Sequence, residues 1–174
     1  NLYQQGQLQQ TLDNAKQLVS QFPNSLTLYN VQGAANAGLG QFDAAIDSFK
    51  QALKIKPENA GVYSNIGNVL RNKGELEAAI KSYKKAIKIK PDYANAYNEM
   101  GLALKNKGDL EAAIVSYQQA LKIKPDLVEA YYNMGNALNN KGDLEAAIES
   151  FKQALKIKPD LVEAYYNMAN ALKD

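Results

Sequence analysis

The sequence predicts an all-α solenoid of stacked antiparallel helix pairs, and three observations lead to this fold class. The tetrapeptide Lys-Ile-Lys-Pro recurs every 34 residues and ends at Pro57, Pro91, Pro125 and Pro159. Within each period, apolar residues twice follow the three-and-four spacing of a helix face. In the last period, Gly142 and Asp143 separate the two apolar runs. A period of this length is typical of repeat proteins, in which neighbouring units share one continuous core.

Four whole units follow from this period, and each is expected to form two helices. The third and fourth differ at only nine of their 34 places. Gly142 is predicted to end a first helix and Asp143 to cap the second helix that follows. Asp160 and Glu163 are predicted to form a capping box for the next helix. The units span residues 26–59, 60–93, 94–127 and 128–161.

Small residues recur where the two helices of a unit must cross closely. Each first helix contains a Gly and each second helix an Ala at a fixed place, which predicts close backbone contact at these positions. Serines recur on the second helices and are expected to face solvent, since no general base stands near them in sequence. These residues are Gly33, Gly67, Gly101 and Gly135; Ala45, Ala79, Ala113 and Ala147; and Ser48, Ser82, Ser116 and Ser150.

The two ends of the chain depart from the whole units. Residues 1–25 retain only Gly6, Leu8 and Pro23 of the pattern, which predicts a divergent partial repeat beginning near the end of a first helix. Residues 162–174 copy the start of the preceding unit and predict the first helix of a truncated repeat. Because the chain opens within a unit and lacks a starting Met, we expect it to be a fragment of a longer protein.

Composition excludes several classes of function. The 174 residues contain no Cys and no His, so thiolate and His-dependent catalysis and the usual zinc, copper and haem ligands are excluded. We therefore predict no catalytic residues, no metal site and no cofactor, and we assign Asp109 and Glu111 to helix-dipole compensation. A net charge of +2 favours neither a nucleic-acid nor a membrane-surface partner. No signal peptide or long apolar run occurs, so a cytoplasmic location is expected.

The pattern within the unit resembles the tetratricopeptide repeat (TPR). The residues at the family's places in the last whole unit are Tyr131, Gly135, Leu138, Ala147, Phe151, Ala154 and Pro159. The resemblance implies a right-handed superhelix in which the first helices line a concave inner groove. It also implies that Tyr97, Tyr131 and Tyr165 belong to the core. The second, fifth, sixth, ninth, twelfth and thirteenth places of each unit lie away from the buried stripe of the first helix and would face the groove.

Asparagines at the sixth and ninth places are the strongest candidates for a binding site. Residues three apart share a helix face, and an amide both donates and accepts hydrogen bonds, which suits it to hold the backbone of an extended peptide. The segment Asn-Met-Gly-Asn-Ala-Leu (133–138) resembles the repeats of O-linked N-acetylglucosamine transferase, where groove asparagines grip substrate backbones. Hydrogen bonding between helices, or to solvent, is the alternative role. The asparagines are Asn65, Asn68, Asn133, Asn136, Asn167 and Asn170, with Asn98 one place away.

Other groove places offer different contacts. Tyr132 and Tyr166 occupy the fifth place and are expected to be exposed on the groove wall, making the C-terminal half the more adhesive one. Arg71 and Lys105 at the twelfth place are the cations that could reach a carboxylate. The second and fifth places carry no Lys or Arg, so a clamp for a terminal carboxylate is not expected.

Three functional hypotheses remain. The first is a protein-protein interaction scaffold, not itself an enzyme, that binds an extended peptide or a partner helix in the groove. The second is the substrate-recruiting arm of a larger enzyme of the glycosyltransferase or sulfotransferase type. The third is a structural solenoid that self-associates head to tail, because Val162–Asp174 would be a first helix with no second helix to cover it.

Overall fold

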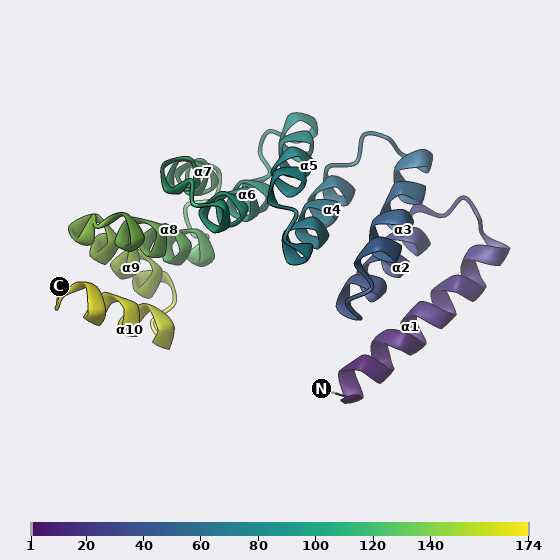
Figure 1. Ribbon diagram of the computed structural model, residues 1–174, viewed down its shortest axis with the longest axis horizontal. Coiled ribbons are helices and arrows are strands. Elements are labelled where there is room, and N and C mark those ends of the chain that lie inside the picture. Colours follow the sequence, from purple (N-terminus) through teal and green to yellow (C-terminus); the bar gives the residue numbers. More distant parts are fainter. Residues whose placement is uncertain (1, 174) are drawn as a thin grey trace. The chain divides into compact units, whose positions relative to one another are not determined.

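The computed structural model describes residues 2–173, which form ten α-helices and no strands (Figure 1). The predicted all-α fold class is therefore confirmed. Asn1 and Asp174, the outermost residues of the predicted end segments, lie outside the described residues. The helices are α1 (Leu2–Gln21), α2 (Leu26–Gly38), α3 (Phe42–Ile55), α4 (Ala60–Lys73), α5 (Leu76–Ile89), α6 (Ala94–Lys107), α7 (Leu110–Ile123), α8 (Val128–Lys141), α9 (Leu144–Ile157) and α10 (Val162–Ala171).

The chain divides into two compact units at the boundary between Lys90 and Pro91. The N-terminal unit contains α1 to α5, and its pairs α2/α3 and α4/α5 are the predicted helix hairpins. The C-terminal unit contains the pairs α6/α7 and α8/α9, followed by α10. Within each unit, second helices pack on the first helices of the next hairpin, as α3 does on α4 and α7 on α8.

Close helix crossing inside each hairpin depends on the recurrent glycines. A Cβ added to Gly67 of α4 would lie 2.5 Å from Cε1 of Tyr83 on α5. Gly135 of α8 has the same relation to Phe151 of α9, at 2.6 Å. The aromatic rings are completely buried, so each occupies the space that a larger residue on the first helix would need. Each recurrent glycine therefore makes room for an aromatic ring of the second helix. Contact between these glycines and the recurrent alanines stays a prediction.

Some of the predicted helix-ending and helix-capping residues are confirmed, and others are not. Gly142 ends α8 at a φ of 87°, a left-handed conformation that a side chain would disfavour. Asp143 caps α9 by accepting a hydrogen bond from the Ala146 backbone N–H at 3.4 Å. The predicted capping box of Asp160 and Glu163 is wrong. The α10 N-cap is Leu161, whose carbonyl accepts from the Ala164 N–H at 3.1 Å, so no side-chain cap forms.

Serines on the second helices are not the solvent-facing residues that we expected. Ser116 and Ser150 are buried, and Ser48 and Ser82 are half-buried. Each hydroxyl donates to the carbonyl four residues earlier in its helix, as Ser150 does to Ala146 at 2.8 Å. This local hydrogen bond satisfies the hydroxyl and allows it to be buried between helices.

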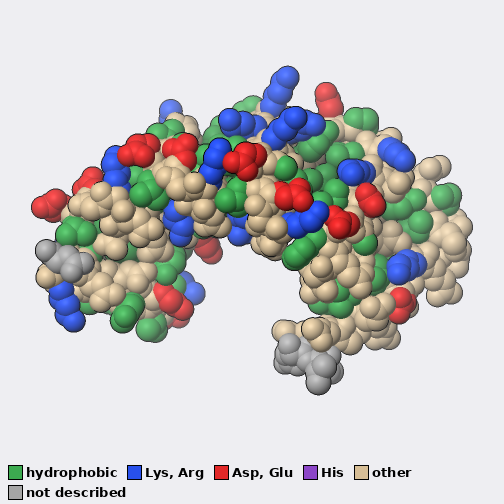
Figure 2. Space-filling model, in the orientation of Figure 1, with side chains coloured by type: hydrophobic (Ala, Val, Ile, Leu, Met, Phe, Trp, Pro, Cys, Tyr) green, Lys and Arg blue, Asp and Glu red, His purple; other side chains and the backbone are tan. Residues whose placement is uncertain are grey.

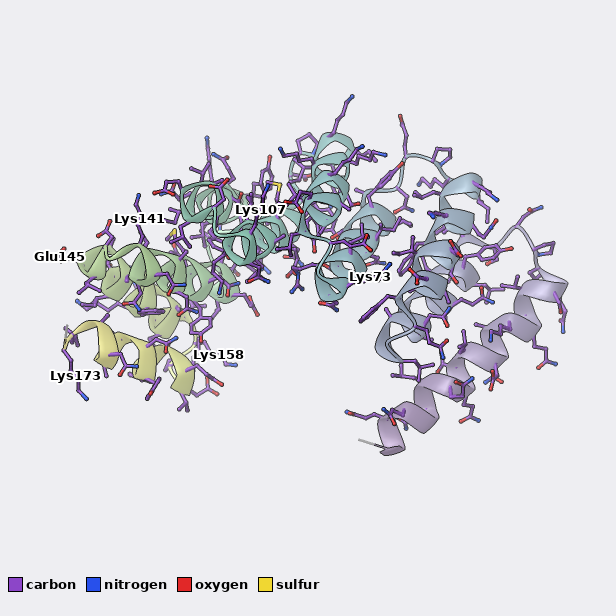
Figure 3. The ribbon with its side chains drawn as sticks, viewed as in Figure 1. Lys73, Lys107, Lys141, Glu145, Lys158 and Lys173 are labelled. Carbon is purple, nitrogen blue, oxygen red and sulfur yellow. The ribbon has the colours of Figure 1, made fainter. Side chains whose placement is uncertain are left out.

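An equivalent ion pair links neighbouring hairpins in both units. Lys73 at the end of α4 reaches Asp43 at 2.7 Å and Glu75 at 2.8 Å, and hydrogen bonds to these carboxylates raise the pKa of Lys73 above its ordinary value (Figure 3). Lys141 at the end of α8 pairs with Glu111 of α7 at 3.2 Å (Figure 3). The pKa of Glu111 is lowered by a hydrogen bond from its own backbone N–H and by Lys141. These pairs are largely exposed, so their contribution to stability is small.

The end helices differ from the prediction in two ways. α1 runs without interruption through Gly6, so no turn separates a first helix from a second there. A single interior Gly costs a helix only about 1 kcal/mol, which does not force a break. Tyr165 of α10 is 49% exposed, so its assignment to the core is wrong. Its counterpart Tyr63 lies between α3 and α5, whereas within the described residues α10 is covered by a second helix on one side only.

Candidate functional site

The predicted binding face is formed by the first helices of the hairpins, and we call it the inner face. In the N-terminal unit it comprises the groove places of α2 and α4, and in the C-terminal unit those of α6, α8 and α10. Because the units are compact bodies of their own, each half of the inner face is described separately.

A concavity of about 220 Å³ opens on the inner face of the N-terminal unit, between α2 and α4. Its α4 side presents three amide side chains, and its α2 side presents the methyl groups of two alanines. The short alanine side chains leave the space that a longer residue at these places would fill. The lining residues are Ala34, Ala37, Phe49, Asn65, Asn68, Val69 and Asn72.

The three asparagines of this concavity keep most of their hydrogen-bonding capacity. Asn68 Oδ1 accepts a hydrogen bond of 2.8 Å from the buried Tyr83 hydroxyl. Among the described residues, neither amide N–H of Asn68 has a partner. Within residues 2–173, no side-chain hydrogen bond engages Asn65 or Asn72. The concavity therefore offers amide donors and acceptors that a ligand could engage.

In the C-terminal unit, the predicted asparagines bind one another across neighbouring first helices. Asn133 of α8 donates to Asn98 of α6 at 3.1 Å. Asn167 of α10 donates to Asn136 of α8 at 2.8 Å and to the Tyr132 hydroxyl at 3.2 Å. Interhelical hydrogen bonding, the alternative role that the sequence left open, is therefore what these amides perform in the structure.

On α6 and α8, the fifth place does not form an exposed groove wall. Asn98 is 5% exposed. Tyr132 is half-buried, and its ring packs against Phe151 with centroids 6.1 Å apart. The fifth place faces the adjacent first helix, so the expectation of an exposed Tyr132 is wrong, whereas Tyr166 on α10 is 67% exposed. Adhesion by Tyr166 stays a prediction.

The remaining candidates are partly accessible. Arg71, Lys105 and Asn170 are each half-buried on their helices. Asn72 is a lining residue that the sequence analysis did not select, although its thirteenth place was among those expected to face the groove. The sequence could not single out Asn72, because the concavity depends on which α2 residues lie opposite α4. Those residues are alanines, which have no functional group that would mark a site.

The chemistry of the inner face is that of neutral amides. Its unpaired amides can donate to carbonyls and accept from N–H groups of an extended segment. Within residues 2–173, no group of three or more Asp, Glu, His or Cys side chains is placed to hold a metal ion. No helix in the same range is long and apolar enough to cross a membrane.

The repeat geometry and the sequence period identify the family. The family model for the TPR repeat matches residues 33–74, 67–108, 103–142 and 135–174. The chain therefore belongs to the TPR repeat family. No protein of curated function is a significant match to the sequence.

Solved TPR structures share the fold over most of the chain. The crystal structure of MamA is 27% identical, has a TM-score of 0.78, and is matched over 92% of this chain and 94% of its own. YrrB, described as a TPR protein with an unusual peptide-binding site, is 24% identical with a TM-score of 0.73 over 95% of this chain and 85% of its own. The first TPR of Spaghetti (RPAP3), bound to the HSP90 peptide SRMEEVD, is 21% identical with a TM-score of 0.64 over 66% of this chain and 90% of its own.

Proposed function

We propose that the chain is a protein-interaction scaffold that binds an extended peptide segment on the inner face of its N-terminal unit. The observation that carries this proposal is the concavity between α2 and α4, where three asparagines converge and two of them have no side-chain hydrogen bond within residues 2–173. Amides in this arrangement bind the peptide backbone and tolerate many side chains.

Two further features of the concavity favour peptide binding: a pre-positioned asparagine side chain and small residues on α2. Asn68 is held by the Tyr83 hydroxyl, so its side chain is positioned before a ligand arrives and less conformational entropy is lost on binding. The alanines of α2 allow a backbone to approach α4 closely. The RPAP3 and YrrB structures, whose descriptions mention a bound peptide and a peptide-binding site, support a peptide as the kind of ligand.

The test substitutes the two asparagines that have no structural partner. Asn65→Ala combined with Asn72→Ala should weaken binding of a peptide selected from a random peptide library by about thirtyfold, because two lost hydrogen bonds of about 1 kcal/mol each total about 2 kcal/mol. The melting temperature should stay unchanged, because neither amide bonds within residues 2–173. Isothermal titration calorimetry measures the affinity, and circular dichroism measures the melting temperature.

A matched control changes two amides elsewhere. Gln118→Ala with Gln119→Ala removes two exposed amides from α7, outside the inner face, and should leave peptide affinity unaltered. Equal weakening by both double variants, or undiminished binding to the Asn65→Ala, Asn72→Ala variant, would mean that the peptide binds elsewhere.

A further inference from the structure

A second concave surface lies on the opposite side of the N-terminal unit, and we call it the outer groove. It has a volume of about 370 Å³, with walls contributed by the second helices α3 and α5 and a floor contributed largely by the first helix α4. The floor is apolar and the rim is cationic. The floor residues are Leu53, Tyr63, Ile66, Leu70 and Ala78, and the rim residues are Lys50, Lys81, Ser82 and Lys85.

The outer groove continues past Tyr63 into a neighbouring concavity of about 360 Å³. Lys85 and Tyr63 line both, and the Lys85 ammonium lies 5.2 Å from the centroid of the Tyr63 ring. This cation-π contact places a charge beside an apolar surface. Lys88 and the partly exposed Ile89 place a further positive charge beside a further apolar side chain along α5.

Lys81 and Lys85 of the rim are particular to α5 and are not required by the repeat. One period before Lys81 and Lys85 stand Asp47 and Gln51, and one and two periods after them stand Val115 and Gln119, then Glu149 and Gln153. In α9, Gln153 donates to Glu149 at 2.7 Å. The groove places between α7 and α9 repeat the apolar floor with Tyr131, Met134 and Leu138 but carry Gln118, Glu149 and Gln153 at the rim. The three lysines are therefore dispensable for the fold.

The N-terminal unit, which contains the lysine rim, is also the more basic part of the chain. Residues 1–90 contain eleven Lys and Arg against six Asp and Glu, whereas residues 91–174 contain nine against twelve. Figure 2 shows Lys and Arg side chains gathered over the part of the surface where α5 lies in Figure 1. Acidic neighbours of the outer groove include Glu58, which lines the second concavity, and Asp47, which pairs with Lys50 at 3.5 Å. Glu77 lies one helical turn before Lys81 on α5. Lysines thus outnumber carboxylates around it.

We propose that the outer groove binds an acidic amphipathic segment of a partner protein. Apolar side chains of the segment would cover Tyr63, Ile66 and Leu70, while its carboxylates would pair with Lys50, Lys81 and Lys85. A nucleic acid is the weaker candidate, because the aliphatic floor offers nothing to phosphates and no arginine lines either concavity. This site is separate from the inner face and does not depend on the function proposed there.

The test measures binding of a fluorescein-labelled helical peptide to the full chain by fluorescence anisotropy. The peptide carries Leu at one helix face and Glu at all other positions. It should bind with an affinity that falls as salt concentration rises. Lys81→Glu with Lys85→Gln, the residues that α9 carries at these places, should weaken binding about tenfold or more. Both lysines are exposed, so circular dichroism should show an unchanged fold.

Two further variants separate a specific site from general attraction. Lys152→Glu with Lys156→Gln makes the same charge change on α9 and should leave the affinity within about twofold of the original. Glu149→Lys with Gln153→Lys transplants the lysines to the α7–α9 groove and should raise the stoichiometry from one peptide to two in calorimetry. Asn65→Ala with Asn72→Ala should have no effect.

Three results would overturn the proposal. Equal weakening by the α5 and α9 charge variants would reduce the effect to net charge. Equal binding of a peptide with Ala in place of Leu would remove the role of the apolar floor. Competition by a single-stranded oligonucleotide at least as strong as that by unlabelled peptide would assign the lysines to phosphate binding instead.

Discussion

The recurrent glycine is the residue on which each hairpin depends most directly. At Gly67 the missing Cβ allows the Tyr83 ring to lie against the α4 backbone, at a distance that no side chain would permit. The Tyr83 hydroxyl then donates a hydrogen bond to Asn68, the residue that follows Gly67 on α4. One small residue thus determines both the packing of the core and the position of a candidate binding residue.

Gly67→Ala should lower the free energy of unfolding by about 1–2 kcal/mol. Overpacking a core costs about 1–3 kcal/mol, and the better helix propensity of Ala recovers up to about 1 kcal/mol. Gly6→Ala is the matched control, because nothing lies within 4 Å of the added Cβ and the variant should be slightly stabilised. Urea unfolding followed by circular dichroism measures both. A stabilised Gly67→Ala would show that the Tyr83 ring moves aside without cost.

At the scale of helices, asparagine side chains join neighbouring first helices in the C-terminal unit, whereas Asn65 in the N-terminal unit makes no such link. Asn98 is buried and accepts from Asn133, which joins α6 to α8. Asn65 has the same type of side chain at the neighbouring place of its repeat but no side-chain partner within residues 2–173. The same amide group is therefore structural where the adjacent first helix supplies an amide, and it has no side-chain partner within residues 2–173 where that helix supplies alanine.

Asn98→Ala should destabilise the protein by about 1–2 kcal/mol, because it removes a buried hydrogen bond and leaves the Asn133 donor with one partner fewer. Asn65→Ala should change stability by less than about 0.5 kcal/mol, as is usual for a side chain without structural partners. The urea midpoints of the two variants provide the comparison. Equal midpoints would contradict the assignment of separate roles to these asparagines.

The helix pairs could be predicted from sequence because each depends on a short local pattern. The period and the Gly142 helix end follow from residues within one unit. The aromatic partner of each glycine was not predicted, although it also lies within the unit. The role of the asparagines could not be predicted, because it depends on what the adjacent first helix presents, Asn98 in one case and Ala34 or Ala37 in the other. Burial of Ser150 and Tyr132 was missed for the same reason, since both face a neighbouring element.

At the scale of the whole molecule, stability is expected to vary along the chain instead of being uniform. Each hairpin of a repeat protein contacts its neighbours alone, so the free energy of local opening depends on how many neighbours an element has. Among the described residues, α10 packs against α9 and α8. Its residues Val162 and Tyr166, and its C-cap Leu172, are at least 66% exposed. Helices α8 and α9 bury Phe151, Leu138 and Leu155 in one cluster.

Amide hydrogen exchange followed by mass spectrometry should therefore show α10 exchanging much faster than α8 and α9. Gly135→Ala should accelerate exchange in α8, α9 and α10, because its Cβ would press on Phe151 at the centre of their shared cluster. Exchange in α2 and α3 should change little, since their packing lies within the N-terminal unit and nearest-neighbour coupling weakens with each intervening repeat. Gly6→Ala controls for the Gly-to-Ala change itself. Uniform acceleration across all helices would mean that the molecule opens as one cooperative unit, and equal protection of α10 and α8 would contradict the dependence on neighbours.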